Sequence, residues 1–254
     1  MAFRVGVGES DFAELRKSDK YYVDKTDIMY ELVEETENKV TLFTRPRRFG
    51  KTLMMNMMMN FFDIQKDSRD IFEGLGITKH KEFCKKWMNQ YPVLFISFKD
   101  EGAYKMLKTR LADVCKELDS ILEEDAVNAA DYDIFKKLMF KTAEEDDVKS
   151  SLKTLMRMLH AVYGKKVILL IDEYDVPLAK INEKNPPENK FYSAMLEVIR
   201  GIMGTALKDN EFLAFAVITG CLRIAKESIF TGTNNFASYS VLDADFSEYF
   251  GFSE

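Results

Sequence analysis

The chain has 254 residues, of which 46% are hydrophobic and 31% charged, with 5 prolines and 12 glycines. This composition excludes a disordered or low-complexity protein, and the length suits one large α/β domain or one domain with a small appendage. A net charge of −6 argues against a dominant surface for the phosphate backbone of a nucleic acid, which needs clustered Lys and Arg.

The longest apolar runs, 167–171 and 212–219, are much shorter than the ~20 residues that span a bilayer, so we expect no membrane helix. The N-terminus lacks the apolar block of a secretory signal, which predicts a cytoplasmic protein. The cysteines Cys84, Cys115 and Cys221 are not spaced as metal ligands. We therefore expect free, mostly buried thiols.

Strand-like and helix-like segments alternate along the chain. Strands are predicted at 40–44, 92–98, 167–171 and 212–219. Helices are predicted after Lys51 and over 107–121, 152–159 and 191–202, where apolar residues recur every three or four positions. Continuous apolar strands are typical of a parallel sheet that is covered on both faces. We expect an α/β fold, a P-loop NTPase layer sandwich with a mainly parallel sheet and helices on both faces.

Three other segments have simple structural interpretations. The acidic stretches 123–133 and 144–147 are interpreted as solvated turns or helix ends. The five methionines within 53–62 are interpreted as core filler, in preference to a soft-metal site or a docking face. Pro186 and Pro187 mark a loop before a helix that starts near residue 188.

The segment Arg45-Pro-Arg-Arg-Phe-Gly-Lys-Thr52 lies between a predicted strand and a predicted helix. In such a turn the backbone N–H groups wrap phosphates, Lys51 reaches the outer phosphates and the Thr52 hydroxyl holds Mg²⁺. The usual pattern begins with glycine, and Arg45 stands in its place, so the string alone leaves open an ordinary helix start. The predicted nucleotide-binding residues are Arg47, Arg48, Phe49, Gly50, Lys51 and Thr52.

The predicted strand 167–171 ends in Asp172 and Glu173, at the edge of the sheet where parallel α/β folds bind ligands. There Asp172 would ligate Mg²⁺, directly or through water, and Glu173 would orient or deprotonate the water that attacks the γ-phosphate. Taken alone, the pair could instead cap a helix. Asp175 is interpreted as a structural cap or surface residue in preference to a metal ligand.

The predicted strand 212–219 ends in a hydroxyl at the same edge. Thr219 could contact the γ-phosphate or the attacking water, and Arg223 could supply positive charge to the transition state. The alternative for Arg223 is a salt bridge to a neighbouring carboxylate. The predicted catalytic residues are thus Lys51, Glu173, Thr219 and Arg223, and the predicted cofactors are ATP and Mg²⁺.

With these segments in place, the chain resembles the AAA-ATPase-like family of bacterial proteins, whose members often carry a PD-(D/E)XK-type nuclease domain after the ATPase. The resemblance is carried by residues 21–26 (YYVDKT), 45–52, 170–175 (LIDEYD), 218–230 (ITGCLRIAKESIF) and 250–252 (FGF). It implies that Arg45 is a family trait, and that Thr219 occupies a sensor position beside the roles given above for Lys51, Thr52, Asp172 and Glu173.

The resemblance covers nearly the whole chain and implies one AAA-ATPase-like P-loop domain over 1–254. Within it we expect an N-terminal segment at 1–38, a nucleotide-binding core at 39–230, and the start of a truncated C-terminal part at 231–254. Because no nuclease domain follows, we expect this chain to be a fragment. Nucleic acid would be contacted only through the missing domain.

Two functional hypotheses remain open. The first is an ATP-binding and ATP-hydrolysing module that acts as a switch for an attached effector, such as a nuclease domain, or for a protein partner, with oligomers possible. The second is a non-hydrolysing nucleotide-binding scaffold for protein assembly. A small-molecule kinase is less favoured, because no arginine-bearing lid is evident.

The segment Tyr21 to Thr26 has two interpretations. Tyr21 or Tyr22 could stack on adenine. Alternatively, Asp24 or Thr26 could cap the following helix, and the second interpretation is favoured.

Overall fold

The computed structural model describes residues 4–5, 8–18, 20–99, 104–184, 190–221, 229–230 and 236–251. Its centre is a sheet of five parallel strands in the order β4-β5-β6-β3-β7. The strands are β3 (Val40–Thr44), β4 (Val93–Ser97), β5 (Val167–Asp172), β6 (Leu213–Gly220) and β7 (Phe236–Ser240). The four strands predicted from apolar runs are confirmed.

The fifth strand, β7, was not predicted. Its sequence, Phe-Ala-Ser-Tyr-Ser, is not continuously apolar, and its first four residues are only half-buried. Such a strand suits the edge of a sheet, where one side has no neighbouring strand. It pairs with β3 from Val40–Phe236 to Thr44–Ser240. The sheet therefore takes a strand from the segment at 231–254.

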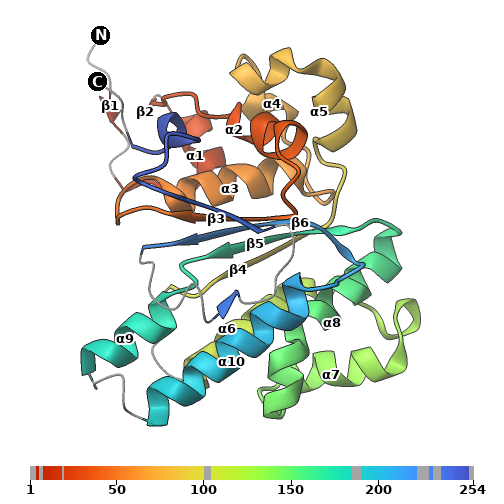
Figure 1. Cartoon of the computed structure of the whole chain (residues 1–254). Helices are drawn as coiled ribbons and strands as arrows, with labels where there is room; N and C mark the ends of the chain where they lie inside the picture. Colours follow the sequence, from red (N-terminus) through yellow and green to blue (C-terminus); the bar gives the residue numbers. More distant parts are fainter. Residues whose placement is uncertain are drawn as a thin grey trace.

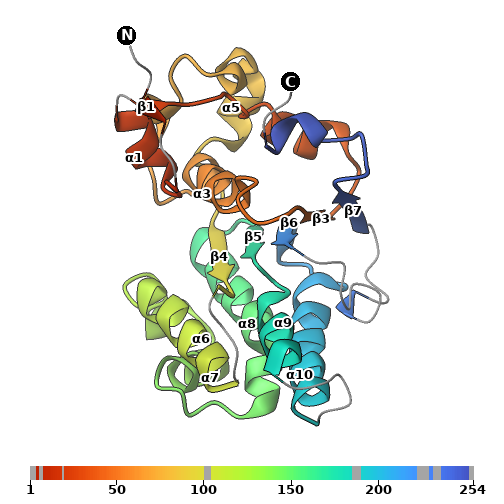
Figure 2. The same cartoon turned by 90° about the vertical axis from the view of Figure 1, so that its left-hand side faces the viewer.

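Helices cover both faces of the sheet, which confirms the layered α/β fold (Figure 1; Figure 2). One face carries α1 (Phe12–Lys17), α2 (Ile28–Tyr30), the π-helical turn Glu31–Glu35, α3 (Lys51–Phe62), α4 (Arg69–Phe72), the 3₁₀ turn Gly76–Lys79 and α5 (Lys81–Trp87). The other carries α6 (Tyr104–Leu118), α7 (Ala129–Met139), α8 (Glu145–Tyr163), α9 (Val176–Lys184) and α10 (Lys190–Leu207).

Smaller elements complete the chain. The strands β1 (Arg4–Val5) and β2 (Lys20–Tyr21) form a separate parallel pair. Two 3₁₀ turns, Glu124–Ala126 and Ser247–Tyr249, follow α6 and β7 in sequence. Within the described residues, no helix combines the length and the apolar character that crossing a membrane requires.

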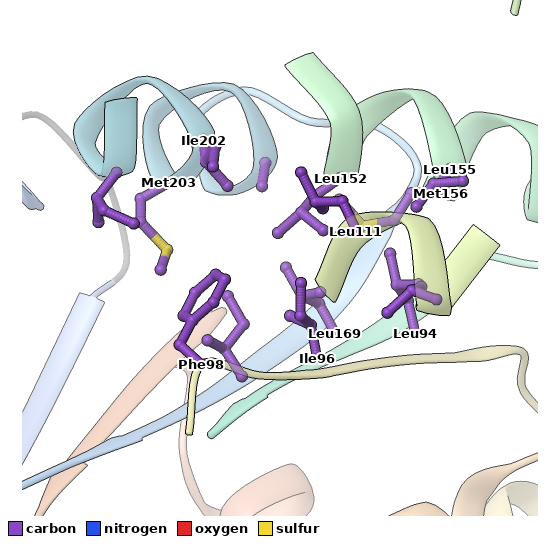
Figure 3. Close-up of a cluster of buried hydrophobic side chains, with 14 of the residues drawn as sticks. Leu94, Ile96, Phe98, Leu111, Leu152, Leu155, Met156, Leu169, Ile202 and Met203 are labelled. Atoms are coloured by element: carbon purple, nitrogen blue, oxygen red, sulfur yellow. The ribbon is translucent and has the colours of Figure 1, made fainter. Parts of the chain in front are cut away.

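The core between the sheet and α6, α8 and α10 is largely aliphatic. In Figure 3 the labelled side chains from the sheet side face those from the helices. The labelled residues are Leu94, Ile96, Phe98, Leu111, Leu152, Leu155, Met156, Leu169, Ile202 and Met203. They recur at strand or helix spacing, so β4, α6, α8 and α10 each turn an apolar face to this core.

The core on the opposite face is rich in aromatic and methionine side chains. Four methionines of α3 are buried, namely Met54, Met55, Met57 and Met58, and Met59 packs against the same cluster. Their interpretation as core filler is confirmed. Phe12, Ile28 and Leu32 belong to this cluster too, so residues from 1–38 share a core with α3.

The acidic stretch at 123–133 is a largely exposed turn and helix end, as predicted, with the exception of Asp131. It contains the start of α7, and Asp131 is buried, where it forms a bidentate ion pair with Arg157 of α8. Local composition could not reveal this partner, which lies 26 residues away. The stretch at 144–147 is a helix end as predicted, because Glu144 and Asp147 form a capping box at the start of α8.

Candidate nucleotide-binding site

Strand pairing brings the predicted site residues to one edge of the sheet. β3 pairs with β6 so that Phe43 lies opposite Thr219 and Thr44 opposite Gly220. β5 runs beside β6, with Ile171 opposite Ile218, so Asp172, the last residue of β5, lies beside Thr219, the second-last residue of β6. Carboxyl ends of parallel strands form the ligand edge of such sheets. The turn after β3 therefore lies directly over these polar side chains.

The turn from Arg45 to Gly50 connects β3 to α3 and contains two residues in the left-handed backbone conformation. Gly50 has φ +80° and Arg48 has φ +69°, a backbone region that residues other than glycine rarely adopt. Residues 46–50 are all exposed, and Gly50 immediately precedes the first helical residue, Lys51. The backbone amides of the turn therefore lie at the positive N-terminal end of a 12-residue helix, a setting that favours the binding of anions.

The side chain of Lys51 is buried and crosses the base of its own turn. Its Nζ donates to the carbonyl oxygens of Arg45 at 3.0 Å and Pro46 at 2.9 Å, and contacts Cys221 Sγ at 3.3 Å. The ammonium group thus lies on the inner side of the turn. This contradicts the alternative of an ordinary helix start with an exposed lysine.

Thr52, Asp172 and Thr219 form a continuous chain of hydrogen bonds beneath the turn. The Thr52 hydroxyl donates to Asp172 Oδ2 at 2.8 Å, and the Thr219 hydroxyl donates to Asp172 Oδ1. Asp172 and Thr219 are both completely buried. The carboxylate of Asp172 therefore accepts hydrogen bonds from two other elements. The structure does not support the alternative in which Asp172 caps the next helix.

Glu173 differs from its neighbour in exposure and backbone. It is partly exposed, and its φ of +56° turns the chain sharply after β5. Its amide donates to the Thr219 hydroxyl at 3.4 Å. Burial and the nearby charge of Asp172 raise the pKa of Glu173, while Lys51 and Lys99 oppose the rise. A carboxylate with a raised pKa at the mouth of a site is suited to accept a proton.

Asp175 is a buried structural residue, so the surface alternative is wrong, and its carboxylate bonds the end of β6. It is buried, and its Oδ2 accepts the amide of Cys221 at 3.0 Å. Tyr174 beside it is fully buried, and a Cβ added to Gly220 would lie only 2.4 Å from Tyr174 Cε1. Glycine at position 220 therefore lets β6 approach the end of β5 closely.

Arg45 turns away from the inner side of the turn. Its guanidinium is buried, donates from Nη1 to the carbonyl oxygens of Thr44 and Tyr239, and stacks over the ring of Phe250 at 4.7 Å. Burial lowers the pKa of Arg45, and the charge of Asp243 opposes this. The residue in the place of the usual glycine therefore anchors the turn to β7.

Comparison with known proteins agrees with this architecture. A family described as "Predicted AAA-ATPase" (AAA-ATPase-like) matches residues 6–230. The chain belongs to the AAA-ATPase-like family. One relative, described as "Uncharacterized protein in vnfD 5'region" from Azotobacter chroococcum mcd 1, is 27% identical over 252 residues. The match covers 99% of this AAA-ATPase-like chain and 43% of the relative, so the chain spans less than half of that protein's length.

The other predicted site residues of this AAA-ATPase-like chain are exposed or undescribed. Arg47 and Arg48 are exposed on the turn, and Phe49 is 38% exposed. Arg223, like Pro186 and Pro187, lies outside the described residues. The turn therefore offers two guanidinium groups and a helix N-terminus to an anion, while the carboxylates lie behind them.

In the segment 21–26, Tyr22 packs against the core and the capping residues bond another element, while stacking of the exposed Tyr21 on adenine stays a prediction. Tyr22 packs edge-on against Phe12, and its hydroxyl donates to Met57 of α3. Asp24 accepts the Gly76 amide at 2.6 Å, and Thr26 accepts the Ile77 amide at 3.1 Å, while α2 has no side-chain cap. The capping prediction was correct in chemistry and wrong in its target. These side chains cap the 3₁₀ turn 76–79, about 50 residues away in sequence.

Sequence reasoning missed two residues at the site. Cys221 was interpreted only as a thiol, but it lies within 3.3 Å of Lys51 Nζ. Its position directly after Gly220, at the end of a predicted strand, was the available signal. Phe250 was noted only as part of the resemblance, and no local pattern links it to Arg45, which is 205 positions earlier.

Proposed function

We propose that this chain binds ATP with Mg²⁺ at the turn 45–50 and hydrolyses the γ-phosphate. The observation that carries the proposal is the buried hydrogen-bond chain from Thr52 through Asp172 to Thr219. It joins the first turn of α3 to the ends of β5 and β6, directly behind the turn. A buried carboxylate with two hydroxyl partners has no evident purpose in an apolar core, but suits a phosphate-metal site.

The donor set fits Mg²⁺. This ion prefers oxygen ligands, and it usually keeps several waters while one or two protein groups and the phosphates complete its shell. Thr52 and Asp172 supply a hydroxyl and a carboxylate oxygen 2.8 Å apart, so they are the residues that would hold it. When bound, the ion would neutralise the charge that develops on the β- and γ-phosphates.

The protein's own residues supply the remaining functions. Lys51 would exchange its carbonyl partners, Arg45 and Pro46, for phosphate oxygens, which bind an ammonium more strongly because they are charged. Glu173, with its raised pKa, would orient the attacking water and accept its proton. Thr219 would sense the γ-phosphate, because its hydroxyl already bridges Asp172 and the amide of Glu173.

We further propose that nucleotide state controls an attached effector or partner. The support is that the matched relative is more than twice as long as this chain, which leaves room for a further domain in such proteins. A nuclease domain is the effector that the family resemblance implies. Regulation of this kind uses the same two-state elements as other nucleotide switches.

The test is calorimetric titration of ATP with Mg²⁺ into the wild-type chain and into Lys51→Ala. Loss of Lys51 removes a charge-assisted contact, so affinity should fall by about 100-fold or more. Lys208→Ala is the matched control, since Lys208 is exposed just after α10. Equal affinity in all three proteins would rule out the proposed site.

Phosphate release separates the two functional hypotheses. If the chain is an ATPase, the wild type should release phosphate. Glu173→Gln should bind ATP with unchanged affinity but release no phosphate. ATP binding with no phosphate release by the wild-type protein, either as this chain or within a longer protein, would instead favour the non-hydrolysing scaffold.

A further inference from the structure

The turn 45–50, which we call the phosphate turn, is attached to β7. The residues to which it is attached lie outside its own sequence motif. Arg45 Nη1 donates to the Tyr239 carbonyl oxygen at 2.9 Å, and the Thr44 hydroxyl donates to the same oxygen at 3.5 Å. Both bonds add to the β3–β7 ladder, which ends at Thr44 and Ser240. The first residue of the turn is therefore fixed to the edge strand.

Beyond β7, the chain returns to the turn as residues 246–251, which we call the C-terminal arm. Phe250 is 6% exposed, and its ring lies under the Arg45 guanidinium at 4.7 Å and beside Phe43 at 5.0 Å. Gly251 has φ +72°, and a Cβ there would lie 3.2 Å from the ring of Phe49. The arm thus contacts Arg45 at the beginning of the phosphate turn and Phe49 near its end.

The far side of the arm is attached to the N-terminal layer. Lys25 Nζ donates to the Glu248 carbonyl oxygen, and the Tyr249 hydroxyl donates to Glu31. Lys25 belongs to the segment 21–26. Its neighbours in sequence, Asp24 and Thr26, are hydrogen-bonded to the 3₁₀ turn 76–79. Two motifs of the family resemblance, 21–26 and the one containing Phe250, therefore meet through the arm.

The Arg45 guanidinium depends on these contacts. It is 2% exposed, and its Nη2 has no hydrogen-bond partner among the residues that the structure describes. Burying a cation is costly unless other groups compensate. Here two carbonyl oxygens and the face of an aromatic ring provide the compensation.

We propose that Arg45 is a positioning residue for nucleotide binding, and that it holds the phosphate turn in its binding shape by fixing it to β7 and Phe250. This inference rests on the proposed function, because it assumes that the turn binds a nucleoside triphosphate. A preformed turn binds phosphate without first paying the entropy of ordering six residues, 45–50. Reciprocally, bound nucleotide stabilises the C-terminal arm.

The first experiment measures the Kd of Mg²⁺-ATP by calorimetry for the wild-type chain and Phe250→Leu, which keeps an apolar side chain but removes the ring face. A partly desolvated cation–π contact predicts affinity weaker by about threefold to thirtyfold. Phe140→Leu is the matched control, because Phe140 is 69% exposed and follows α7 on the opposite face of the sheet. Its Kd should remain within about twofold of the wild type.

The second experiment measures hydrogen exchange of the amides of 246–251 with and without Mg²⁺-ATP. Nucleotide should slow exchange in the wild type and have a smaller effect in Phe250→Leu. A role of Phe250 in stability alone would lower the melting temperature without removing this nucleotide effect, so the measurement distinguishes the two roles.

Arg45→Lys keeps the charge but lacks the planar fork, and provides a test that does not depend on how Phe250→Leu folds. It should weaken Mg²⁺-ATP binding at least as much as Phe250→Leu does. Suppose that the wild type binds Mg²⁺-ATP and Lys51→Ala does not, but that Arg45→Lys and folded Phe250→Leu bind it as tightly as the wild type. This result would overturn the positioning role of Arg45 and leave the proposed function standing. Failure of the wild type to bind ATP would overturn the proposed function instead.

Discussion

The two sides of β3 surround the phosphate turn with different chemistry. On the β6 side lie buried oxygen groups, with Asp172 hydrogen-bonded to Thr52 and Thr219. On the β7 side lie a cation and aromatic rings, with Arg45 over Phe250. On the β6 side a carboxylate receives two hydroxyls, whereas on the β7 side the turn is held by a carbonyl oxygen of Tyr239 and the ring of Phe250.

This difference indicates a division of work around one turn. Under the proposed function, the groups that would touch a nucleotide are polar and lie at the ends of central strands. Groups that only hold the turn can be apolar, and they come from the edge strand and the arm after it. Variants on the β6 side should therefore change chemistry, and variants on the β7 side should change affinity and stability.

The largest effect is expected from Asp172→Asn. The substitution removes the negative charge that would hold Mg²⁺ while keeping the size of the side chain, so kcat for ATP hydrolysis should fall by about 1000-fold. Phosphate-release assays over a range of Mg²⁺ concentrations measure it. Asp70→Asn, at an exposed position of α4, is the control. Full turnover in Asp172→Asn would remove the chemical role assigned to the β6 side.

Gly220→Ala tests whether the β6 side also depends on close packing. The new Cβ would lie 2.4 Å from Cε1 and 2.7 Å from Cδ1 of Tyr174, which is fully buried and has little room to move. We expect destabilisation by about 2–3 kcal/mol in denaturant unfolding. Gly204→Ala is the control, because no atom lies within 4 Å of its Cβ in α10. That variant should gain up to about 1 kcal/mol.

Asp243→Asn tests the electrostatic part of the β7 side. Asp243 accepts from the Ser240 amide at 2.6 Å and hydroxyl at 2.8 Å, and its charge favours the protonated guanidinium of Arg45. Asparagine keeps an acceptor oxygen and loses the charge. Stability should fall by about 1 kcal/mol at low salt, and the difference should shrink at high salt. A loss that is independent of salt would contradict an electrostatic cause.

The smallest effect is a gain in stability from Glu173→Gln. Burial and Asp172 raise the pKa of Glu173 in the folded state, so ionised Glu173 opposes folding at neutral pH. This cost arises as pH rises from the ordinary glutamate range through the raised pKa, and is absent below both. The melting temperature should increase by about 2 °C at neutral pH, with the gain disappearing in acid. A decrease at neutral pH would show that the folded state favours the ionised carboxylate.

Much of the β6 side could be predicted from local sequence. Apolar runs predicted the strands that end near Asp172 and Thr219, because a strand buried on both faces must be apolar along its length. The helix after Lys51 followed from its composition, which contains neither proline nor glycine. Since parallel strands end at a common edge, their polar last residues could be expected to meet.

The sequence by itself determined the layered α/β fold and which polar residues lie at the ends of β5 and β6, because strand and helix periods are local properties. Only the tertiary structure decided how Arg45 is used, that β7 extends the sheet, and which partner buries Asp131. A guanidinium can bind a phosphate, a carboxylate, a carbonyl oxygen or the face of an aromatic ring. Its choice depends on which distant residue folding places within reach, and here that residue is Phe250.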